Sequence, residues 1–242
     1  MERAHQVDEQ PFLVGGAELL DVNIVAAFAQ PVPQINNFSN LVAQGRLRRF
    51  LRPPVTISQV VAVDPARGAA PTIQAESMRS QKNIAVTAQR LEAHDLSGDW
   101  EGMADTLPDL VVELAAELQA GPLLALGFNY ELTYDLQGET AAHAIGDRLL
   151  AHDPALVPDA LDFSGGAARI FLSGDAGTTY TISVEPRAND PVTGTLWIAG
   201  NCNMPVENLP GVEELRGAFV RGFNAFSHVV NAVLRDPRRG AP

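Results

Sequence analysis

The chain contains one cysteine and one lysine in 242 residues, and each scarcity excludes a kind of site. Cys202 has no partner for an internal disulfide and no companions for a cysteine-rich zinc site, so a reducing compartment such as the cytoplasm is expected. Lys82 lies in the segment RSQKN, which has the composition of a hairpin turn. It is therefore a poor candidate for a phosphate-binding loop or for a Schiff base.

Basic residues are outnumbered by acids, 17 to 29, and long apolar runs are missing. The N-terminal segment MERAHQVDEQPF has no basic stretch followed by an apolar one, so it does not predict a secretory signal, and no apolar run approaches the length of a membrane span. The net charge of -12 makes nucleic-acid binding an unfavoured expectation, because that binding depends on Lys and Arg neutralising phosphates. No motif indicates a cofactor. The sequence predicts an acidic globular protein of the cytoplasm without membrane association.

The segment LLALGFNYELTYDL, residues 123–136, is the clearest strand. Successive side chains of a strand point to opposite faces. Apolar and aromatic residues share one parity here, and polar residues occupy the other from Asn129 onward. Parallel sheets that are buried on both faces show continuous apolar runs instead. The alternation therefore predicts an antiparallel sheet covered on one face only. The apolar set is Leu124, Leu126, Phe128, Tyr130, Leu132, Tyr134 and Leu136; the polar set is Asn129, Glu131, Thr133 and Asp135.

The same order of elements occurs twice along the chain. We expect a first repeat at 18–120 and a second at 121–236, between an N-terminal arm (1–17) and a C-terminal tail (237–242). Each repeat reads as strand, helix, three strands, helix. The first has strands at 19–29, 55–63, 72–78 and 83–93, with helices at 35–51 and from 106; the second has strands at 123–136, 167–173, 178–186 and 194–204, with helices at 139–151 and from 208.

Each closing helix is expected to begin at a Leu-Pro pair. Thr106 and Asn208 read as capping residues that precede Pro108 and Pro210, and proline is tolerated in a first helical turn. The last helix carries Phe219, Phe223 and Phe226 on one stripe, which predicts a core-facing side. The fold class is therefore α+β, a curved, mostly antiparallel sheet of about eight strands backed by two long helices.

This order of elements, twice over, resembles the saddle of the TATA-box-binding protein fold from residue 18 to 236. The GFNYEL strand and the terminal aromatic helix are also similar to those of sporadically distributed, uncharacterised bacterial proteins of about this length. DNA binding through the open face of a saddle needs basic residues and apolar wedges. The polar face predicted here carries acids and amides instead: Asp21, Asn23, Asn129, Glu131 and Asp135.

A candidate binding site follows from the strand GTLWIAGNCNM. Leu196, Ile198, Cys202 and Met204 share the inward parity, so Cys202 is expected to be buried, and Trp197 is expected on the polar face. A large aromatic side chain on an uncovered polar face is typical of a partner-binding site. The predicted binding residues are Asn129, Glu131, Trp197 and Asn201.

Two alternatives for Trp197 are open. Gly200 could mark a bulge that reverses the parity of the strand. The N-terminal arm around Phe12 and Leu13 could instead fold over Trp197.

Three further groups are weighed against a purely structural role. His143 and Asp147 are four residues apart on an expected helix, and with His152 and Asp153 they could hold a metal, although an exposed helix face followed by a loop is the favoured interpretation. No third ligand follows at a typical metal-site spacing. A second group lies at the end of an expected strand and could form half of an acid/base site, or could be surface charge at the strand end. It consists of Glu92, His94 and Asp95.

The basic cluster QGRLRRFLRPP could contact an anionic partner, or could complement the dipole at the end of a helix. Its arginines are Arg46, Arg48, Arg49 and Arg52. The leading hypothesis is a non-enzymatic module that binds another protein or a second copy of itself. The alternatives are an enzyme with a site between the halves, possibly metal-dependent, and nucleic-acid binding through the arginine cluster.

Overall fold

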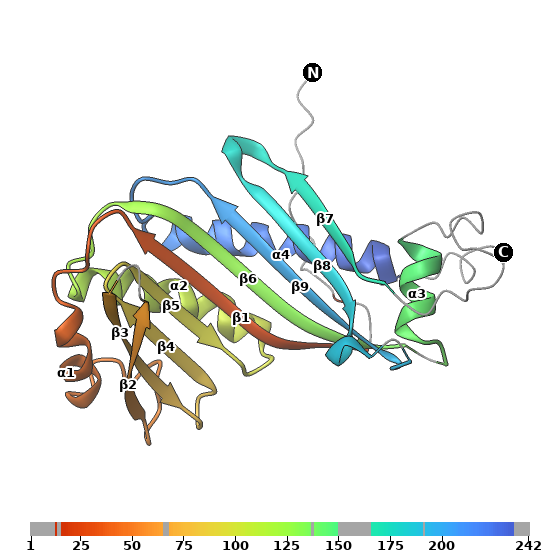
Figure 1. The fold of residues 1–242 in the computed structure, drawn as a ribbon. Coiled ribbons are helices and arrows are strands. Elements are labelled where there is room, and N and C mark those ends of the chain that lie inside the picture. The colour runs from red at the N-terminus through yellow and green to blue at the C-terminus, as the bar shows by residue number, and fades with distance from the viewer. Residues whose placement is uncertain are drawn as a thin grey trace.

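The computed structural model describes residue 13 and residues 16–64, 68–136, 138–149, 166–190 and 192–234, except for the side chains of 61–64, 68–70 and 189. In these parts of the chain nine strands form one sheet, in the order β2-β3-β4-β5-β1-β6-β9-β8-β7, and every neighbouring pair is antiparallel (Figure 1). The strands are β1 (Ala17–Phe28), β2 (Thr56–Asp64), β3 (Gly68–Ser77), β4 (Lys82–Thr87), β5 (Arg90–Asp95), β6 (Leu123–Asp135), β7 (Ala168–Ser173), β8 (Thr179–Pro186) and β9 (Thr195–Met204).

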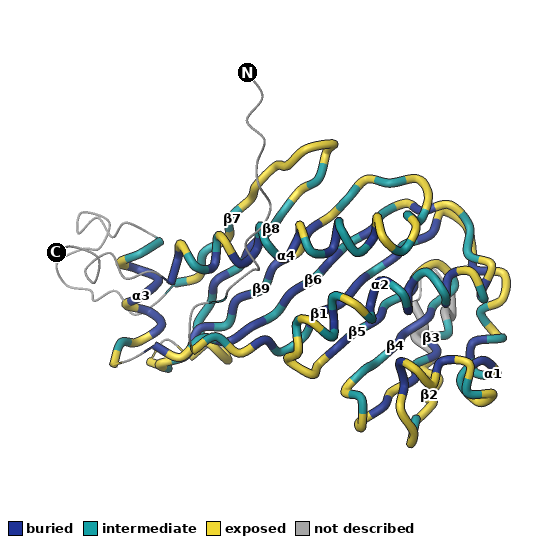
Figure 2. Tube along the Cα trace, turned by 180° about the vertical axis from the view of Figure 1, so that it is seen from behind, coloured by how far each residue is buried: buried dark blue, intermediate teal, exposed yellow. Residues whose placement is uncertain are grey.

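Two helices cover one face of this sheet. Figure 2 shows α2 and α4 lying across it, α2 over β1 and β5 and α4 over β6 and β9. The opposite face, toward the viewer in Figure 1, carries no helix in the described part of the chain and is called the open face below. None of the helices in these ranges is both long and apolar enough to cross a membrane. The helices are α1 (Phe38–Ala43), α2 (Trp100–Glu117), α3 (Ala141–Arg148) and α4 (Val212–Leu234), with short 3-10 turns at Ile35–Asn37, Asp175–Gly177 and Arg187–Asn189.

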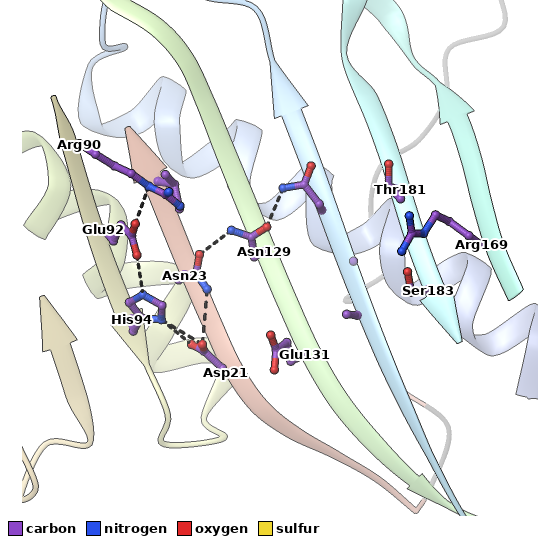
Figure 3. A pocket seen from close by; sticks show the side chains of 14 residues that line it. Asp21, Asn23, Arg90, Glu92, His94, Asn129, Glu131, Arg169, Thr181 and Ser183 are labelled. Carbon is purple, nitrogen blue, oxygen red and sulfur yellow. Dashed lines mark hydrogen bonds and ion pairs between the residues drawn. The ribbon is translucent and has the colours of Figure 1, made fainter. Parts of the chain in front are cut away.

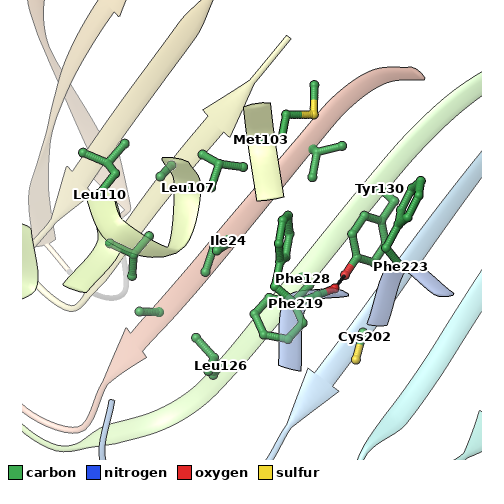
Figure 4. Close-up of a cluster of buried hydrophobic side chains, with 14 of the residues drawn as sticks. Ile24, Met103, Leu107, Leu110, Leu126, Phe128, Tyr130, Cys202, Phe219 and Phe223 are labelled. Carbon is green, nitrogen blue, oxygen red and sulfur yellow. Dashed lines mark hydrogen bonds between the residues drawn. The ribbon is translucent and has the colours of Figure 1, made fainter. Parts of the chain in front are cut away.

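Aromatic side chains fill the space between α4 and the sheet (Figure 4). Phe223 stacks on Trp100 of α2 with ring centroids 3.6 Å apart, and Tyr130 of β6 meets Phe223 edge-on at 5.4 Å. The Tyr130 hydroxyl is buried and donates a hydrogen bond to the backbone carbonyl of Phe219 at 2.9 Å. Phe219, Phe223 and Phe226 are each exposed by 1% or less, so the predicted core stripe of the last helix is confirmed.

Gly200 makes room for this aromatic layer. The register of β9 with β6 and with β8 runs without a shift through Gly200, so the bulge considered from the sequence is wrong. A Cβ atom at Gly200 would lie 2.4 Å from a ring carbon of Phe226, which no real packing tolerates. The glycine therefore reflects close approach of a helix and not a break in the strand.

The alternation predicted for β6 is confirmed at its centre, where Leu126, Phe128, Tyr130 and Leu132 are buried. Leu124 departs from it, with 68% of its surface exposed. The pairing of β1 with β6 shifts register between Ala27 and Phe28, opposite this end of β6. A one-residue slip moves side chains to the other face, so parity at the start of the strand is not that of its centre.

The helix starts predicted at the two Leu-Pro pairs are wrong. α2 begins at Trp100, and the carboxylate of Asp99 caps it by accepting a hydrogen bond from the backbone N–H of Gly102 at 3.2 Å. Pro108 consequently lies inside α2, whereas Pro210 lies before α4 begins at Val212. The two prolines do not occupy matching positions.

Two other expectations about the first half are corrected. The helix expected at 35–51 ends at Ala43 and continues as turns. The single strand expected at 83–93 is a hairpin of β4 and β5, joined by Ala88 and Gln89, so four strands and not three follow α1. Neither loop residue is glycine, proline, asparagine or aspartate, the residues that ordinarily indicate such a turn.

Candidate functional site

The open face contains a shallow pocket of about 310 Å³ over the middle of the sheet (Figure 3). The side chains that line it come from strands far apart in sequence but adjacent in the sheet, from β5 at one side to β7 at the other. The lining residues are Asp21, Asn23, Val25, Arg90, Glu92, His94, Asn129, Glu131, Arg169, Thr181, Ser183, Ala199, Gly200 and Asn201.

A chain of side-chain hydrogen bonds crosses the pocket. The amide of Asn201 donates to Asn129 at 2.6 Å, Asn129 donates to Asn23 at 2.6 Å, and Asn23 donates to Asp21 at 3.4 Å. Register explains this order, because the three asparagines occupy directly opposed positions on β9, β6 and β1. Asn129 and Asn23 each accept at the side-chain carbonyl from the preceding amide and donate onward, so the chain has one direction, toward the carboxylate of Asp21.

His94 of β5 closes the chain from the other side. Its Nδ1 lies 2.9 Å from Asp21 and its Nε2 lies 3.4 Å from Glu92, which also pairs with Arg90. Burial by itself lowers the pKa of His94, but the hydrogen bonds to the two carboxylates and their charges outweigh it and raise that pKa to about 9. The hydrogen bond from His94 lowers the pKa of Glu92 below its ordinary value, against the effect of burial. His94 is thus an imidazolium at neutral pH, with both ring nitrogens engaged.

Glu131 faces the pocket beside Asp21, its directly opposed residue on β1. Partial burial and the charge of Asp21 raise the pKa of Glu131, while a hydrogen bond from Trp197 works in the opposite direction. Trp197 does not line the pocket itself but donates a hydrogen bond to Glu131, which does.

The four residues predicted as a binding site share the open face. Asn129, Glu131 and Asn201 line the pocket, and Trp197 adjoins it through Glu131. Their role in binding stays a prediction. Leu13 packs against the hydrophobic core, and Phe12 lies outside the described residues, as do the arm at 1–12 and the tail at 237–242.

The acid/base trio considered from the sequence is divided between two faces. Glu92 and His94 lie on the open face, whereas Asp95 is fully buried on the helix side, where it pairs with Lys82. Lys82 also donates to Thr106 of α2 at 3.2 Å. Burial lowers the pKa of Lys82 to about 8, a change that the charge of Asp99 opposes. Lys82 is therefore the first residue of β4 and part of a buried ion pair, not a residue of an exposed turn.

The other candidates lie apart from the pocket. His143 and Asp147 interact at 3.3 Å across one turn of α3, and His152 and Asp153 fall outside the described residues. Among the residues that the structure describes, no group of three or more His, Cys, Asp or Glu side chains could hold a metal ion. Cys202 is buried as expected, and burial raises its pKa to about 11.

The arginine cluster lies in turns that follow α1. The sequence had suggested the last turn of a helix instead, and the structure does not show one there. Arg46 pairs with Glu117 and Arg49 pairs with Glu113, both on α2. Half of the cluster is thus neutralised by the chain's own acids, which reduces its attraction for phosphates.

Sequence reasoning missed Arg90, Arg169, Thr181 and Ser183 as pocket residues. The first of these was detectable, because Arg90, Glu92 and His94 alternate along one strand in the way that the polar face of β6 does. The side chain of Arg169 gave no such signal, since the apolar residues around it on β7 do not alternate cleanly with polar ones.

In comparisons with known proteins, no family model matches the chain, and no curated protein matches it at a significant level.

Proposed function

We propose that the open face is a binding surface for a protein partner and that its recognition centre is the chain of hydrogen bonds from Asn201 to His94. One observation carries this proposal. Asn23 is only 5% exposed on a face that no described helix covers, and its polar atoms are fixed by Asn129 and Asp21. Side chains that are ordered before binding lose little conformational entropy when a partner arrives.

The geometry favours binding over acid–base catalysis. A general base needs a nitrogen or oxygen free to accept the substrate's proton. Both ring nitrogens of His94 are engaged by carboxylates, and its raised pKa keeps it protonated at neutral pH. The pocket is shallow and most of its lining residues are polar or charged, unlike the enclosed, mostly apolar cavities typical of small-molecule sites.

The charge of the face also favours a protein over a nucleic acid. Asp21, Glu92 and Glu131 line the pocket together with His94, Arg90 and Arg169, so acids and bases are balanced there. A surface that follows a phosphate backbone needs an excess of positive charge. Mixed charge of this kind suits the polar side chains and backbone groups of another protein.

We also infer that the two halves of the sheet derive from one duplicated unit and that the resemblance to a saddle-shaped fold extends to topology. β1 and β6 pair at the centre, and each half continues outward from there, as β1-β5-β4-β3 and as β6-β9-β8-β7. β2 is an addition to the first half on this reading. A cytoplasmic location is part of the same proposal, since the single cysteine favours a reducing compartment.

Site-specific crosslinking tests the binding surface. A photoreactive residue at Asn201 should form crosslinks to protein in cells, whereas the same residue at the exposed Glu214 on α4 should not. The double variant Trp197→Ala, Glu131→Ala should keep its circular dichroism and melting temperature and lose those crosslinks. The variant Glu214→Ala is the matched control and should keep them. Equal crosslinking from both positions, or full crosslinking in the double variant, would contradict the proposal.

A further inference from the structure

The open face carries charges of opposite sign at the two ends of one row of residues. Strand register places five residues directly opposite one another across β1, β6, β9, β8 and β7. This set, the Asp21 row, consists of Asp21, Glu131, Ala199, Ser183 and Arg169.

Neighbouring strands are about 4.8 Å apart, so the acids and the base lie on opposite sides of β9, which is the middle strand of the five. Ala199 occupies the centre of the row, where its small side chain leaves the floor of the pocket open. Arg169 is exposed at the end, on the edge strand β7, and forms no ion pair with any residue in the described ranges. The row therefore presents an unused cation at one end and an acidic pair at the other.

We propose that the partner of this face is a second copy of the chain, related by a two-fold axis that runs along β9. The inference rests on the proposed binding function of the open face and names its occupant. Rotation about such an axis turns the faces toward each other and exchanges β6 with β8 and β1 with β7. Arg169 of each copy then faces Asp21 of the other, with Glu131 one strand away. An isologous interface of this kind makes every contact twice.

A second row meets the same requirement. Asn23, Asn129, Asn201, Thr181 and Phe171 are directly opposed across the same five strands and form the Asn23 row.

Under the same axis Asn201 lies at the centre and faces Asn201 of the other copy, and amides can pair reciprocally. Phe171 is 72% exposed on the edge strand and would cover Asn23 of the other copy. An aromatic side chain that is costly to leave in water is thereby buried against the partner.

The remaining rows introduce no charge conflict between strands that face each other. Val25, Gly127, Asn203, Thr179 and Ser173 form an uncharged row on these five strands. In the next row Trp197 lies on the axis and meets its own counterpart, while Glu185 of β8 faces Thr133 of β6. Like charges directly opposite one another would oppose the arrangement, and this register contains none.

The available area suits a weak dimer. Five strands at about 4.8 Å and about eight residues at about 3.3 Å give a surface of roughly 24 by 26 Å, or roughly 600 Å² on each copy. The total of roughly 1,200 Å² is at the lower limit of stable interfaces. Face-to-face sheets keep their strand directions within about 30° of each other, which preserves the row-to-row contacts nearest the axis.

Charge-swap variants test the arrangement by sedimentation equilibrium. The wild-type chain should dimerise between about 1 µM and about 1 mM, the range open to interfaces of this size. Variant A, Asp21→Asn with Glu131→Arg, and variant B, Arg169→Glu, should each weaken dimerisation at least about tenfold, because like charges then meet twice. The asparagine introduced in variant A keeps the shape of the carboxylate that it replaces, and circular dichroism checks that both variants fold.

Mixing variants A and B gives the decisive result. In the mixed dimer the arginine introduced at position 131 of variant A lies one strand away from the position opposite the glutamate introduced in variant B, within reach of its long side chain, and the native Arg169 of A faces the native Asp21 of B beside Glu131. A heterodimer should therefore form although neither variant dimerises well alone. Native mass spectrometry distinguishes it by mass. The control pair Glu214→Arg and Arg221→Glu on α4 should leave dimerisation unchanged.

Several results would overturn the inference: a monomer up to about 1 mM, a dimer insensitive to A and B, or no heterodimer on mixing. If the chain stays monomeric while Asn201 still crosslinks to other proteins, the binding function stands and the second copy is excluded as its partner. If Asn201 crosslinks to nothing, the binding function itself fails.

Discussion

Replacing His94 with glutamine should remove a specific pH dependence from the stability of the fold. The folded-state pKa of His94 is about 9, whereas that of an exposed histidine is 6.5. Because folding raises this pKa, the stabilisation is complete below about pH 6.5 and disappears as pH rises through about 9. Glutamine keeps the hydrogen-bonding capacity of the ring in part but cannot carry the proton.

The size of the effect follows from the two pKa values. Their difference corresponds to a maximum of about 3 kcal/mol. The side chain of His94 is 22% exposed, so solvent screens its ion pairs only in part. Between about pH 6 and about pH 8 the stabilisation should fall by about 2 kcal/mol. That is a substantial fraction of the stability of a typical domain.

Urea unfolding followed by tryptophan fluorescence measures this difference, since Trp100 is stacked in the aromatic core. The free energy of unfolding of the wild-type chain should exceed that of His94→Gln most at about pH 6, and the gap should narrow by about 2 kcal/mol at about pH 8. The comparison ends at about pH 8, because above that pH the deprotonation of Lys82, whose pKa burial lowers to about 8, adds a second pH dependence to the stability of the fold. Parallel pH profiles for the two proteins would refute the role assigned to His94.

Two further predictions concern the core. Phe223→Ala should lower the free energy of unfolding by about 3 to 5 kcal/mol, because it removes a ring that stacks on Trp100 and meets Tyr130 edge-on; an unchanged melting temperature would show that the stripe is not core. Gly200→Ala should cost about 1 to 3 kcal/mol through overlap with Phe226, measured by thermal unfolding, while the outward-facing Ala199→Gly serves as the control and should cost less.

The sheet and its covered face could be predicted from alternation alone. The centre of β6 alternates without interruption, and a buried face fixes register strongly. The placement of Trp197 and Asn201 on the face of Asn129 followed from the same periodicity. These inferences succeeded because strand parity depends only on local geometry.

Other features depended on contacts that no local pattern contains. Thr106 and Pro108 look like a helix start, but Asp99 caps the helix two turns earlier, and the capping signal before Trp100 was the better one. Asp95 was grouped with Glu92 and His94 by sequence distance, although alternation places it on the other face. The pairing of Asp95 with Lys82 is set by the register of the β4–β5 hairpin, which places the two residues directly opposite each other.

The candidate site illustrates the same limit. Asp21 and His94 are 73 residues apart in sequence and meet only because β1 pairs with β5. Arg169 reaches the pocket because β7 is added to the far side of β8. One sequence gives residue types and parity, whereas the order of strands in the sheet decides which polar residues become neighbours.

The burial of the single lysine gives this protein an unusual chemical property. Lys82 is the only side-chain amine in the chain, and its ion pair with Asp95 lies beneath the start of α2. Because only 11% of the Lys82 side chain is exposed, an acylating reagent should reach that amine chiefly when α2 separates from the sheet. The rate of amine modification at Lys82 reports how often this end of the helix opens, so the native sequence already contains a single-site probe of local unfolding.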